Sequence, residues 1–368
     1  MGHRGKVNSL TFNVLLLIAG FAVSFLILEI ALRWLSPPSF FTPLLPLRPM
    51  MKIQLQVDLD GVSKDGRHTT NRWGLRGDEP PDPWKSYQTI VTIGGSTTQC
   101  YYLDDHKTWP YRLQEKMKSQ IPQVWVGNGG LDGHSTRAHL IFMDEVIEKI
   151  RPNRVIFLTG TNDLGLSLSE ERFLHGSPFD QARFRSPMSF QDFLLFKSRT
   201  LQLITLWKWI YFHDIPTVHQ AAHQNFVPKP LAEPEAPLPD SLETFLPQLA
   251  EYESNLRSLI SRARQMNVEP VFLTQPSLFE DNGYWKTIEA HLAWIPHLKR
   301  TLSAASYWKL LDRYNETLLK VCSEEQIRCL DLASEMPHDA RYFYDSSHFT
   351  EEGAEFVADK VSEFLLKP

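Results

Sequence analysis

The chain has 368 residues, 42% hydrophobic and 22% charged, an ordinary composition for a globular protein. Its length allows one large domain with appendages or two modest domains. A formal net charge of −5, with no basic tract, no repeat period and no zinc-type cysteine spacing, excludes repeat proteins and zinc proteins and gives no reason to expect nucleic acid as a partner.

The first predicted element is an uncharged apolar run from Leu10 to Leu28, preceded by basic residues. As a helix this run nearly matches the roughly 30 Å hydrocarbon core of a membrane. No clear small-x-small cleavage site follows, and the pattern continues as a helix with Glu29 and Arg33 four residues apart. We therefore predict a transmembrane signal anchor over residues 1–36, with the rest of the chain on the extracytoplasmic (periplasmic) side. A cleaved signal peptide is the alternative.

Residues 37–85 begin with the repeated prolines of "PPSFFTPLLPLRP", which exclude a continuous helix. We interpret this region as a stalk and juxtadomain segment. A large domain then spans residues 86–368, with an insertion at about 165–245 that is too long for an ordinary connection. Two interpretations of the aromatic-rich part of the insertion stay open. It is either a helix packed on the domain, or a lid or membrane-contacting helix beside a binding site of the domain.

Five short apolar runs are the predicted strands of this domain: 89–95, 124–130, 154–163, 269–277 and 327–332. Each run is mostly continuous rather than alternating, as in strands that are buried on both faces. Amphipathic helical segments lie between them, and a last helix from Glu351 to Leu366 follows the N-cap candidate Thr350. This alternation predicts an α/β three-layer sandwich with a five-stranded parallel sheet.

The cysteines leave two possibilities open. Cys322 and Cys329 can close a short loop as a disulfide in an oxidising compartment, which leaves Cys100 unpaired, or all three are buried thiols. The acidic and histidine cluster at residues 104–106 is interpreted as a solvated loop rather than a metal site, because consecutive neighbours rarely converge on one ion. The sequence indicates no metal and no cofactor.

Polar residues follow the strands at their carboxyl ends. "GGSTT" follows the first strand, "NGGLDGHS" the second and "GTND" the third, and "DSSH" precedes the last helix. Ligands of open parallel sheets bind at this edge. Each block alone is typical of a turn or a helix cap. The four blocks in this order predict that a serine, an aspartate, a histidine and several hydrogen-bond donors converge.

The order of these blocks resembles the SGNH hydrolase family, also called GDSL-type esterases and lipases, which implies a flavodoxin-like three-layer fold. Motif by motif, the resemblance places the family's serine, glycine and asparagine at Ser96, Gly133 and Asn162. It places the closing Asp-x-x-His at Asp345 and His348.

The resemblance extends over residues 89–366, and the anchor and stalk look like those of membrane-anchored bacterial members. One departure is that the usual Gly-Asp-Ser reads Gly-Gly-Ser here. In the family, that aspartate supports the local backbone and does not attack the substrate. The departure therefore concerns the rigidity of the serine loop rather than the nucleophile.

The physical roles of these residues follow from their chemistry. The Ser96 hydroxyl needs a base within hydrogen-bond reach, and an imidazole such as His348 can take and return a proton near neutral pH. Asp345 can accept from the imidazole Nδ1–H and fix its tautomer. The expected oxyanion hole consists of the Ser96 N–H, the Gly133 N–H and the Asn162 side-chain amide.

The sequence thus predicts a membrane-anchored extracytoplasmic serine esterase that hydrolyses an acyl ester, for instance an acetyl ester, through an acyl-enzyme. The expected partners are an acyl-ester substrate, carried by a glycan or a lipid, and the membrane itself through the N-terminal helix. Two alternatives stay open: an O-acyltransferase or deacetylase acting on a cell-envelope polysaccharide, and a non-catalytic binding module with this fold. Phosphate-binding and dinucleotide-binding loops are excluded, because "GGSTTQ" has neither the lysine nor the glycine spacing that they require.

Overall fold

The structure is a computed structural model that describes residues 9–35, 45, 47–168, 198–201, 203–204, 218–221, 246, 248–279, 294–295, 300–301 and 304–367. The chain divides into two compact units, Met1–Pro43 with Pro187–Asp214 and Leu44–Ser186 with Ile215–Pro368.

The first unit contains the helix α1 (Ser9–Leu35). Its segment Phe12–Trp34 has a mean hydropathy of 2.6. By its length and composition, this segment could cross a membrane. Glu29 and Arg33 form the expected ion pair at 2.9 Å. The Glu29 carboxylate also accepts hydrogen bonds from the backbone N–H groups of Arg199 and Thr200, and so it caps a short helical stretch of the insertion.

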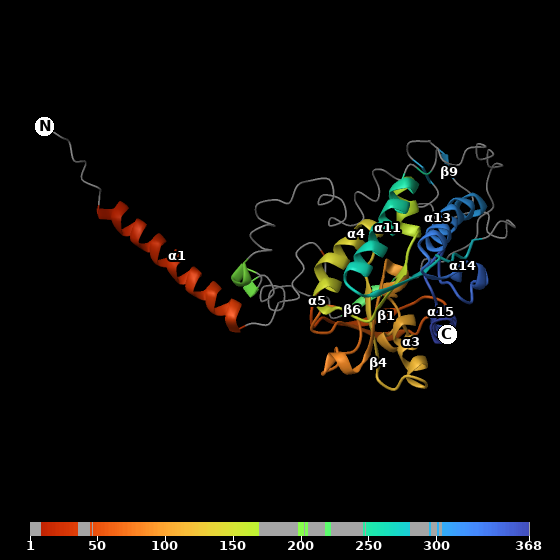
Figure 1. Cartoon of the computed structure of the whole chain (residues 1–368), viewed down its shortest axis with the longest axis horizontal. Helices are drawn as coiled ribbons and strands as arrows, with labels where there is room; N and C mark the ends of the chain where they lie inside the picture. Colours follow the sequence, from red (N-terminus) through yellow and green to blue (C-terminus); the bar gives the residue numbers. More distant parts are fainter. Residues whose placement is uncertain are drawn as a thin grey trace. The chain divides into compact units, whose positions relative to one another are not determined.

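The second unit is built on a five-stranded sheet in the order β10-β7-β5-β3-β4 (Figure 1). Every neighbouring pair in this sheet is parallel, so the predicted α/β class and the five-stranded parallel sheet are confirmed. The strands are buried almost throughout, which explains why they read as continuous apolar runs. Their bounds are β3 (Gln88–Gly94), β4 (Val124–Gly130), β5 (Arg154–Leu158), β7 (Glu269–Leu273) and β10 (Arg328–Leu330).

Helices cover the sheet on both faces, which makes the three layers (Figure 1). On one face α3 (Trp109–Lys118) packs against α15 (Glu351–Leu366), and their apolar residues share a core with β3 and β4. On the other face α4 (Thr136–Phe142), α11 (Leu249–Gln265) and α13 (Ala304–Glu325) pack together. As expected, Thr350 caps α15, its Oγ1 accepting from the Gly353 N–H at 3.0 Å.

Shorter elements complete the described part of the chain. They are α2 (Ser96–Gln99), α5 (Glu148–Ile150), α6 (Thr161–Leu168), α14 (Leu332–Glu335), β8 (Trp294–Ile295), β9 (Arg300–Thr301), 3-10 turns at Trp84–Ser86 and Asp105–Lys107, and a π-helical turn at Met143–Ile147.

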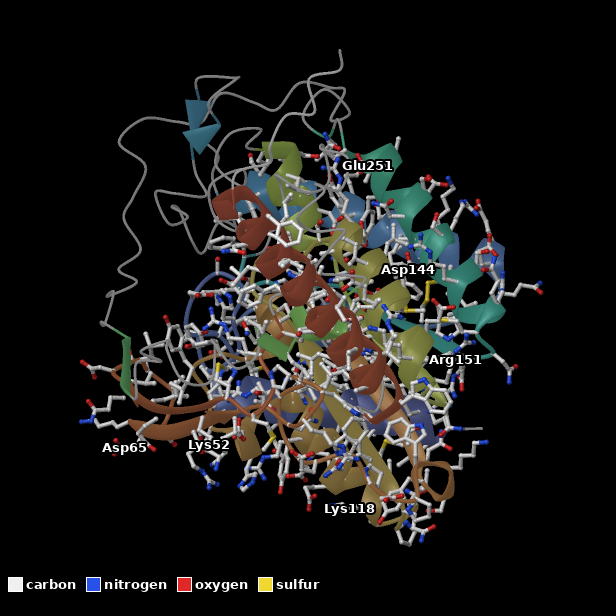
Figure 2. All side chains as sticks on the ribbon, turned by 90° about the vertical axis from the view of Figure 1, so that its left-hand side faces the viewer. Lys52, Asp65, Lys118, Asp144, Arg151 and Glu251 are labelled. Carbon is white, nitrogen blue, oxygen red and sulfur yellow. A yellow bond between two sulfur atoms is a disulfide. The ribbon has the colours of Figure 1, made fainter. Side chains whose placement is uncertain are left out.

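Part of residues 37–85, the predicted stalk and juxtadomain segment, forms strands. Strands β1 (Lys52–Val57) and β2 (Asp65–Thr69) form an antiparallel pair there, and β6 (Val218–Ala221) pairs with β1 in parallel. Alternate side chains of β1 are buried, whereas Lys52 points away from the core (Figure 2). The sequence "KIQLQV" alternates polar and apolar residues with the same period of two, which indicates a half-buried strand. The proline content of the preceding residues does not reveal it.

A disulfide joins Cys322 near the end of α13 to Cys329 in β10. It closes a short loop between neighbouring elements, one of the two possibilities that the sequence left open. Cys100 is a free and buried thiol. Burial raises the pKa of the Cys100 thiol to about 11, so this cysteine is an inert part of the core.

Candidate active site

Ser96 lies at the carboxyl end of β3, on a sharp strand-to-helix turn. The buried strand ends at Gly94, Gly95 is the N-cap, and Ser96 is the first residue of the four-residue helix α2. Cys100 ends the helix in a left-handed conformation with φ of 52°, and its N–H donates to the Ser96 carbonyl at 2.8 Å. The turn leaves the Ser96 side chain partly exposed at the edge of the sheet.

The structure brings Ser96 together with the histidine and the aspartate of the last loop. Ser96 Oγ lies 2.7 Å from His348 Nε2, and His348 Nδ1 lies 2.6 Å from Asp345 Oδ2. The Tyr344 ring stacks on the imidazole with ring centroids 5.5 Å apart and planes 5° from parallel. The Tyr344 N–H also donates to the His348 carbonyl at 3.0 Å, which closes the loop around Asp345.

The Asp345 carboxylate is held in its charged form. Burial alone would raise its pKa, but the neighbouring His348 ring and the hydrogen bonds from the backbone N–H groups of Ser347 and His348 lower the pKa below its ordinary value. These two N–H groups donate to Asp345 Oδ1 at 2.9 and 2.7 Å. The other oxygen, Oδ2, therefore accepts from Nδ1–H of His348, and Nε2 is left to accept a hydrogen bond from the Ser96 hydroxyl.

Asn162 and Gly133 come from the two neighbouring blocks. Asn162 is the second residue of α6, and its Nδ2 donates to the His134 carbonyl at 2.9 Å. A Cβ atom on Gly95 would overlap this Nδ2, so the amide lies directly against the turn that carries Ser96. Gly133 precedes His134 and has φ of 73°, a conformation that glycine adopts without strain.

Asp163 ties the loops of Gly133 and Asn162 together, a role that the sequence analysis missed. Its buried carboxylate accepts from the Thr136 N–H at 3.1 and 3.2 Å, and Thr136 begins α4 just after the Gly133 loop. Burial raises the pKa of Asp163 to about 6, although hydrogen bonds from Thr136 and Thr159 lower it. The sequence feature that points to this role is the aspartate that ends "GTND", because aspartate often caps helices.

The interpretation of residues 104–106 as a solvated loop is wrong for one of the three. Asp105 is buried and forms an ion pair with Arg76 at 2.9 Å, whereas His106 is exposed. The pairing depends on a residue 29 positions away, so the local run of charges could not reveal it. Within the described residues, no group of three His, Cys, Asp or Glu side chains is placed to hold a metal ion.

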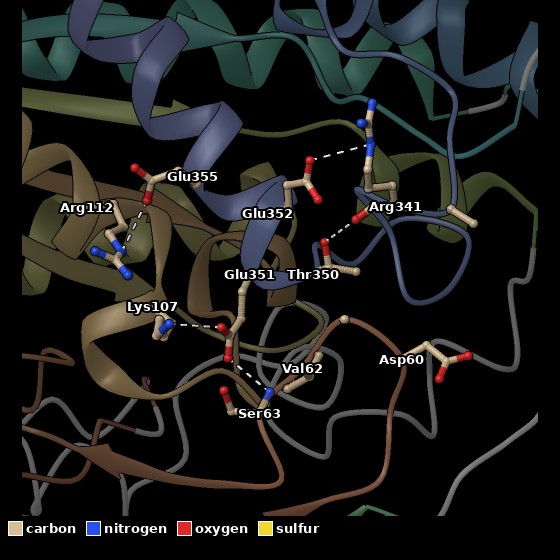
Figure 3. Close-up of a pocket in the computed structure, with 12 residues that line it drawn as sticks. Asp60, Val62, Ser63, Lys107, Arg112, Arg341, Thr350, Glu351, Glu352 and Glu355 are labelled. Carbon is tan, nitrogen blue, oxygen red and sulfur yellow. Dashed lines mark hydrogen bonds and ion pairs between the residues drawn. The ribbon is translucent and has the colours of Figure 1, made fainter.

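An open cavity of about 870 Å³ lies where the loop at residues 60–63 meets the start of α15 (Figure 3). Three ion pairs lie among its lining residues: Lys107 with Glu351 at 3.0 Å, Arg112 with Glu355 at 3.2 Å and Arg341 with Glu352 at 3.4 Å. The Ser63 N–H also donates to the Glu351 carboxylate at 2.9 Å. Ser96, Asp345 and His348 are not among the residues that line this cavity. We interpret these contacts as the junction that holds the loop to the helix.

Residues 92–356 match the model of the GDSL-like lipase/acylhydrolase family. The match covers more than half of the chain, and the chain belongs to this family. The resemblance drawn from the four sequence blocks is thereby confirmed. The protein is accordingly a carboxylic ester hydrolase.

Similar solved structures include the acetylxylan esterase Axe2 from Geobacillus stearothermophilus, with 15% identity over 76% of this chain and 95% of that chain and a TM-score of 0.43. The acetyl xylan esterase AlAXEase has 13% identity over 76% and 100% of the chains and a TM-score of 0.43. LAE5, an alpha/beta hydrolase enzyme from the metagenome of Lake Arreo in Spain, has 13% identity over 75% and 94% and a TM-score of 0.44. No curated protein matches the chain. At such low identity these structures do not identify a substrate for this chain.

Replacing Gly95 with alanine should lower kcat for a small acyl ester by about tenfold to a hundredfold, because the added methyl group would displace the Asn162 amide, which the sequence predicts to be an oxyanion donor. Alanine adopts the Gly95 φ of −84° readily, so the fold should persist. Steady-state kinetics of Gly95→Ala, Asn162→Ala and the double variant check this. Losses that simply add in the double variant would show that the two residues act independently.

Proposed function

We propose that the protein is a serine esterase in which Ser96 is the nucleophile, His348 the general base and Asp345 the residue that orients the imidazole. The observation that carries this proposal is the continuous chain of hydrogen bonds from Ser96 Oγ to His348 Nε2 at 2.7 Å and from Nδ1 to Asp345 at 2.6 Å. Serine is a weak nucleophile at neutral pH and requires such a base.

The reaction proceeds in two acyl transfers. Ser96 Oγ attacks the ester carbonyl while Nε2 of His348 takes the hydroxyl proton, and the imidazolium then protonates the departing alcohol. Water, deprotonated by the same nitrogen, then attacks the Ser96 acyl ester, and the imidazolium returns the proton to the departing Ser96 Oγ as the carboxylic acid is released. The N–H groups of Ser96 and Gly133 and the Asn162 amide stabilise the oxyanion in both steps, each donor contributing on the order of 3 kcal/mol.

The proposed location is the extracytoplasmic face of a membrane, with α1 as an uncleaved anchor over residues 1–36. The apolar segment Phe12–Trp34 supports the anchor. The disulfide between Cys322 and Cys329 supports an oxidising compartment, because such bonds are rare in the cytosol. The proposed substrates are acyl esters, such as acetyl esters, of a cell-envelope glycan or lipid.

The test uses the full chain in detergent with p-nitrophenyl acetate and, separately, a fluorophosphonate probe. We expect release of acetate and p-nitrophenol, and a single phosphonylated peptide containing Ser96. No labelling and no turnover would favour a non-catalytic binding module. Addition of an acetyl donor and a glycan acceptor separates the hydrolase from an O-acyltransferase: free acetate supports hydrolysis, and a heavier glycan contradicts it.

A further inference from the structure

A buried arginine outside the predicted site contacts the turn that carries Ser96. The Arg76 side chain is only 3% exposed. A guanidinium has five N–H donors, and here five acceptors surround it. They are Asp105 Oδ1 and the carbonyls of Gln99 at 2.7 Å, Cys100 at 2.6 Å, Arg67 at 3.3 Å and Leu103. Three of these carbonyls belong to the turn that follows Ser96.

Two of these carbonyls, those of Gln99 and Cys100, are at the end of α2, where a helix leaves its last carbonyl groups without partners inside the helix. Asn128 of β4 donates to the Thr98 carbonyl at 2.9 Å, and Arg76 donates to the carbonyls of the next two residues, Gln99 and Cys100. The Cys100 N–H in turn donates to the Ser96 carbonyl at 2.8 Å. Arg76 is thus one hydrogen-bonded residue away from the Ser96 backbone.

Asp105 holds the guanidinium from the other side. Its side chain is 7% exposed and also accepts from the Thr69 N–H at 3.0 Å and the Thr69 Oγ1 at 2.7 Å. The ion pair is therefore buried with its hydrogen-bonding groups occupied, the condition under which such a pair is tolerated. The Arg76 backbone is itself fixed to the edge of the sheet, because its N–H donates to the Asn128 carbonyl at 2.8 Å.

We propose that Arg76 is a positioning residue for Ser96, clamped in place by Asp105. This inference rests on the proposed function of Ser96. Arg76 supports the backbone of the Ser96 turn from the end of α2, through the carbonyls of Gln99 and Cys100. A shift of Ser96 Oγ relative to His348 Nε2 slows the chemical step, whereas the affinity for a small ester should change little.

The test is the variant Arg76→Lys in the full chain, assayed with p-nitrophenyl acetate. A lysine ammonium cannot reproduce the five-donor fork, so we expect kcat to fall by about tenfold to a hundredfold while KM changes by less than about threefold. Asp105→Asn keeps the bonds from Arg76 to the turn but leaves a buried guanidinium without its counter-charge. We expect it to lower stability at least as much as Arg76→Lys, but kcat by only about fivefold.

We therefore expect Arg76→Lys to have the larger loss of kcat and Asp105→Asn to have at least as large a loss of stability. If Arg76 had only a structural role, the loss of kcat would follow the loss of stability in both variants. The matched control is Arg154→Lys, which removes the two guanidinium hydrogen bonds to Glu269 Oε2 (2.9 and 2.6 Å) at the amino end of β5, and we expect it to leave kcat unchanged. The proposal is overturned if Arg76→Lys keeps kcat within about threefold of wild type. It is also overturned if kcat falls as far in Arg154→Lys as in Arg76→Lys.

If Arg76→Lys does not fold, Asp105→Asn decides alone: a loss of kcat at unchanged KM supports the proposal, and a kcat within about twofold of wild type overturns it. Ser96→Ala is assayed alongside. An active Ser96→Ala variant refutes the proposed function itself. An inactive Ser96→Ala variant beside a fully active Arg76→Lys variant refutes only the positioning role.

Discussion

Replacing Ser96 with alanine should lower kcat for a small acyl ester by about 10⁴- to 10⁶-fold and leave the fold intact, because no acyl-enzyme can form without the hydroxyl. Ser96 is partly exposed, and its side chain contacts His348 at the edge of the sheet. Removing the oxygen therefore creates no cavity in the core. The residual rate over water comes from the oxyanion donors and from substrate binding.

The measurement combines steady-state kinetics with fluorophosphonate labelling and thermal unfolding of each variant. Ser347→Ala is the matched control, because Ser347 lies beside His348 on the same loop and contributes its backbone N–H rather than its hydroxyl to Asp345. We expect the control to keep its kcat within about threefold and its labelling in full. Loss of labelling in Ser347→Ala, or turnover that survives Ser96→Ala, would refute the nucleophile assignment.

The strands of the parallel sheet could be predicted because burial on both faces makes each of them a continuous apolar run. Their ends were less certain. The third run was predicted over residues 154–163, but β5 ends at Leu158, and the polar "TGTND" already belongs to the turn and to α6. The topology then placed the four polar blocks at one edge, since parallel strands all present their carboxyl ends there.

The contacts that hold the candidate site together could not be predicted in the same way. Arg76 and Asp105 are separated by 29 positions and by a turn, and their pairing exists only once β1 and β2 lie against the loop after α2. Asp163 reaches Thr136 across 27 positions. Neither pair follows a helical or strand periodicity or a motif spacing from which the contact could be predicted. The predicted helix or lid of the insertion at 165–245 falls largely outside the described residues.

Replacing His348 with alanine should be nearly as damaging as the loss of Ser96, lowering kcat by about 10⁴-fold or more, because the serine then has no base and the leaving alcohol no acid. Asp345→Asn should cost somewhat less. An asparagine amide can donate its N–H to Nδ1, which favours the other tautomer of the imidazole, and it carries no negative charge to stabilise the imidazolium.

The interaction between these residues is measured with the double variant Ser96→Ala/His348→Ala. If Ser96 Oγ and His348 Nε2 act as the single unit that their 2.7 Å contact indicates, the double variant should be no slower than Ser96→Ala alone. The rate of fluorophosphonate labelling should fall in His348→Ala as steeply as kcat, since both reactions need the activated hydroxyl. Rapid labelling of that variant would mean that another group activates Ser96, and the role assigned to the imidazole would then be wrong.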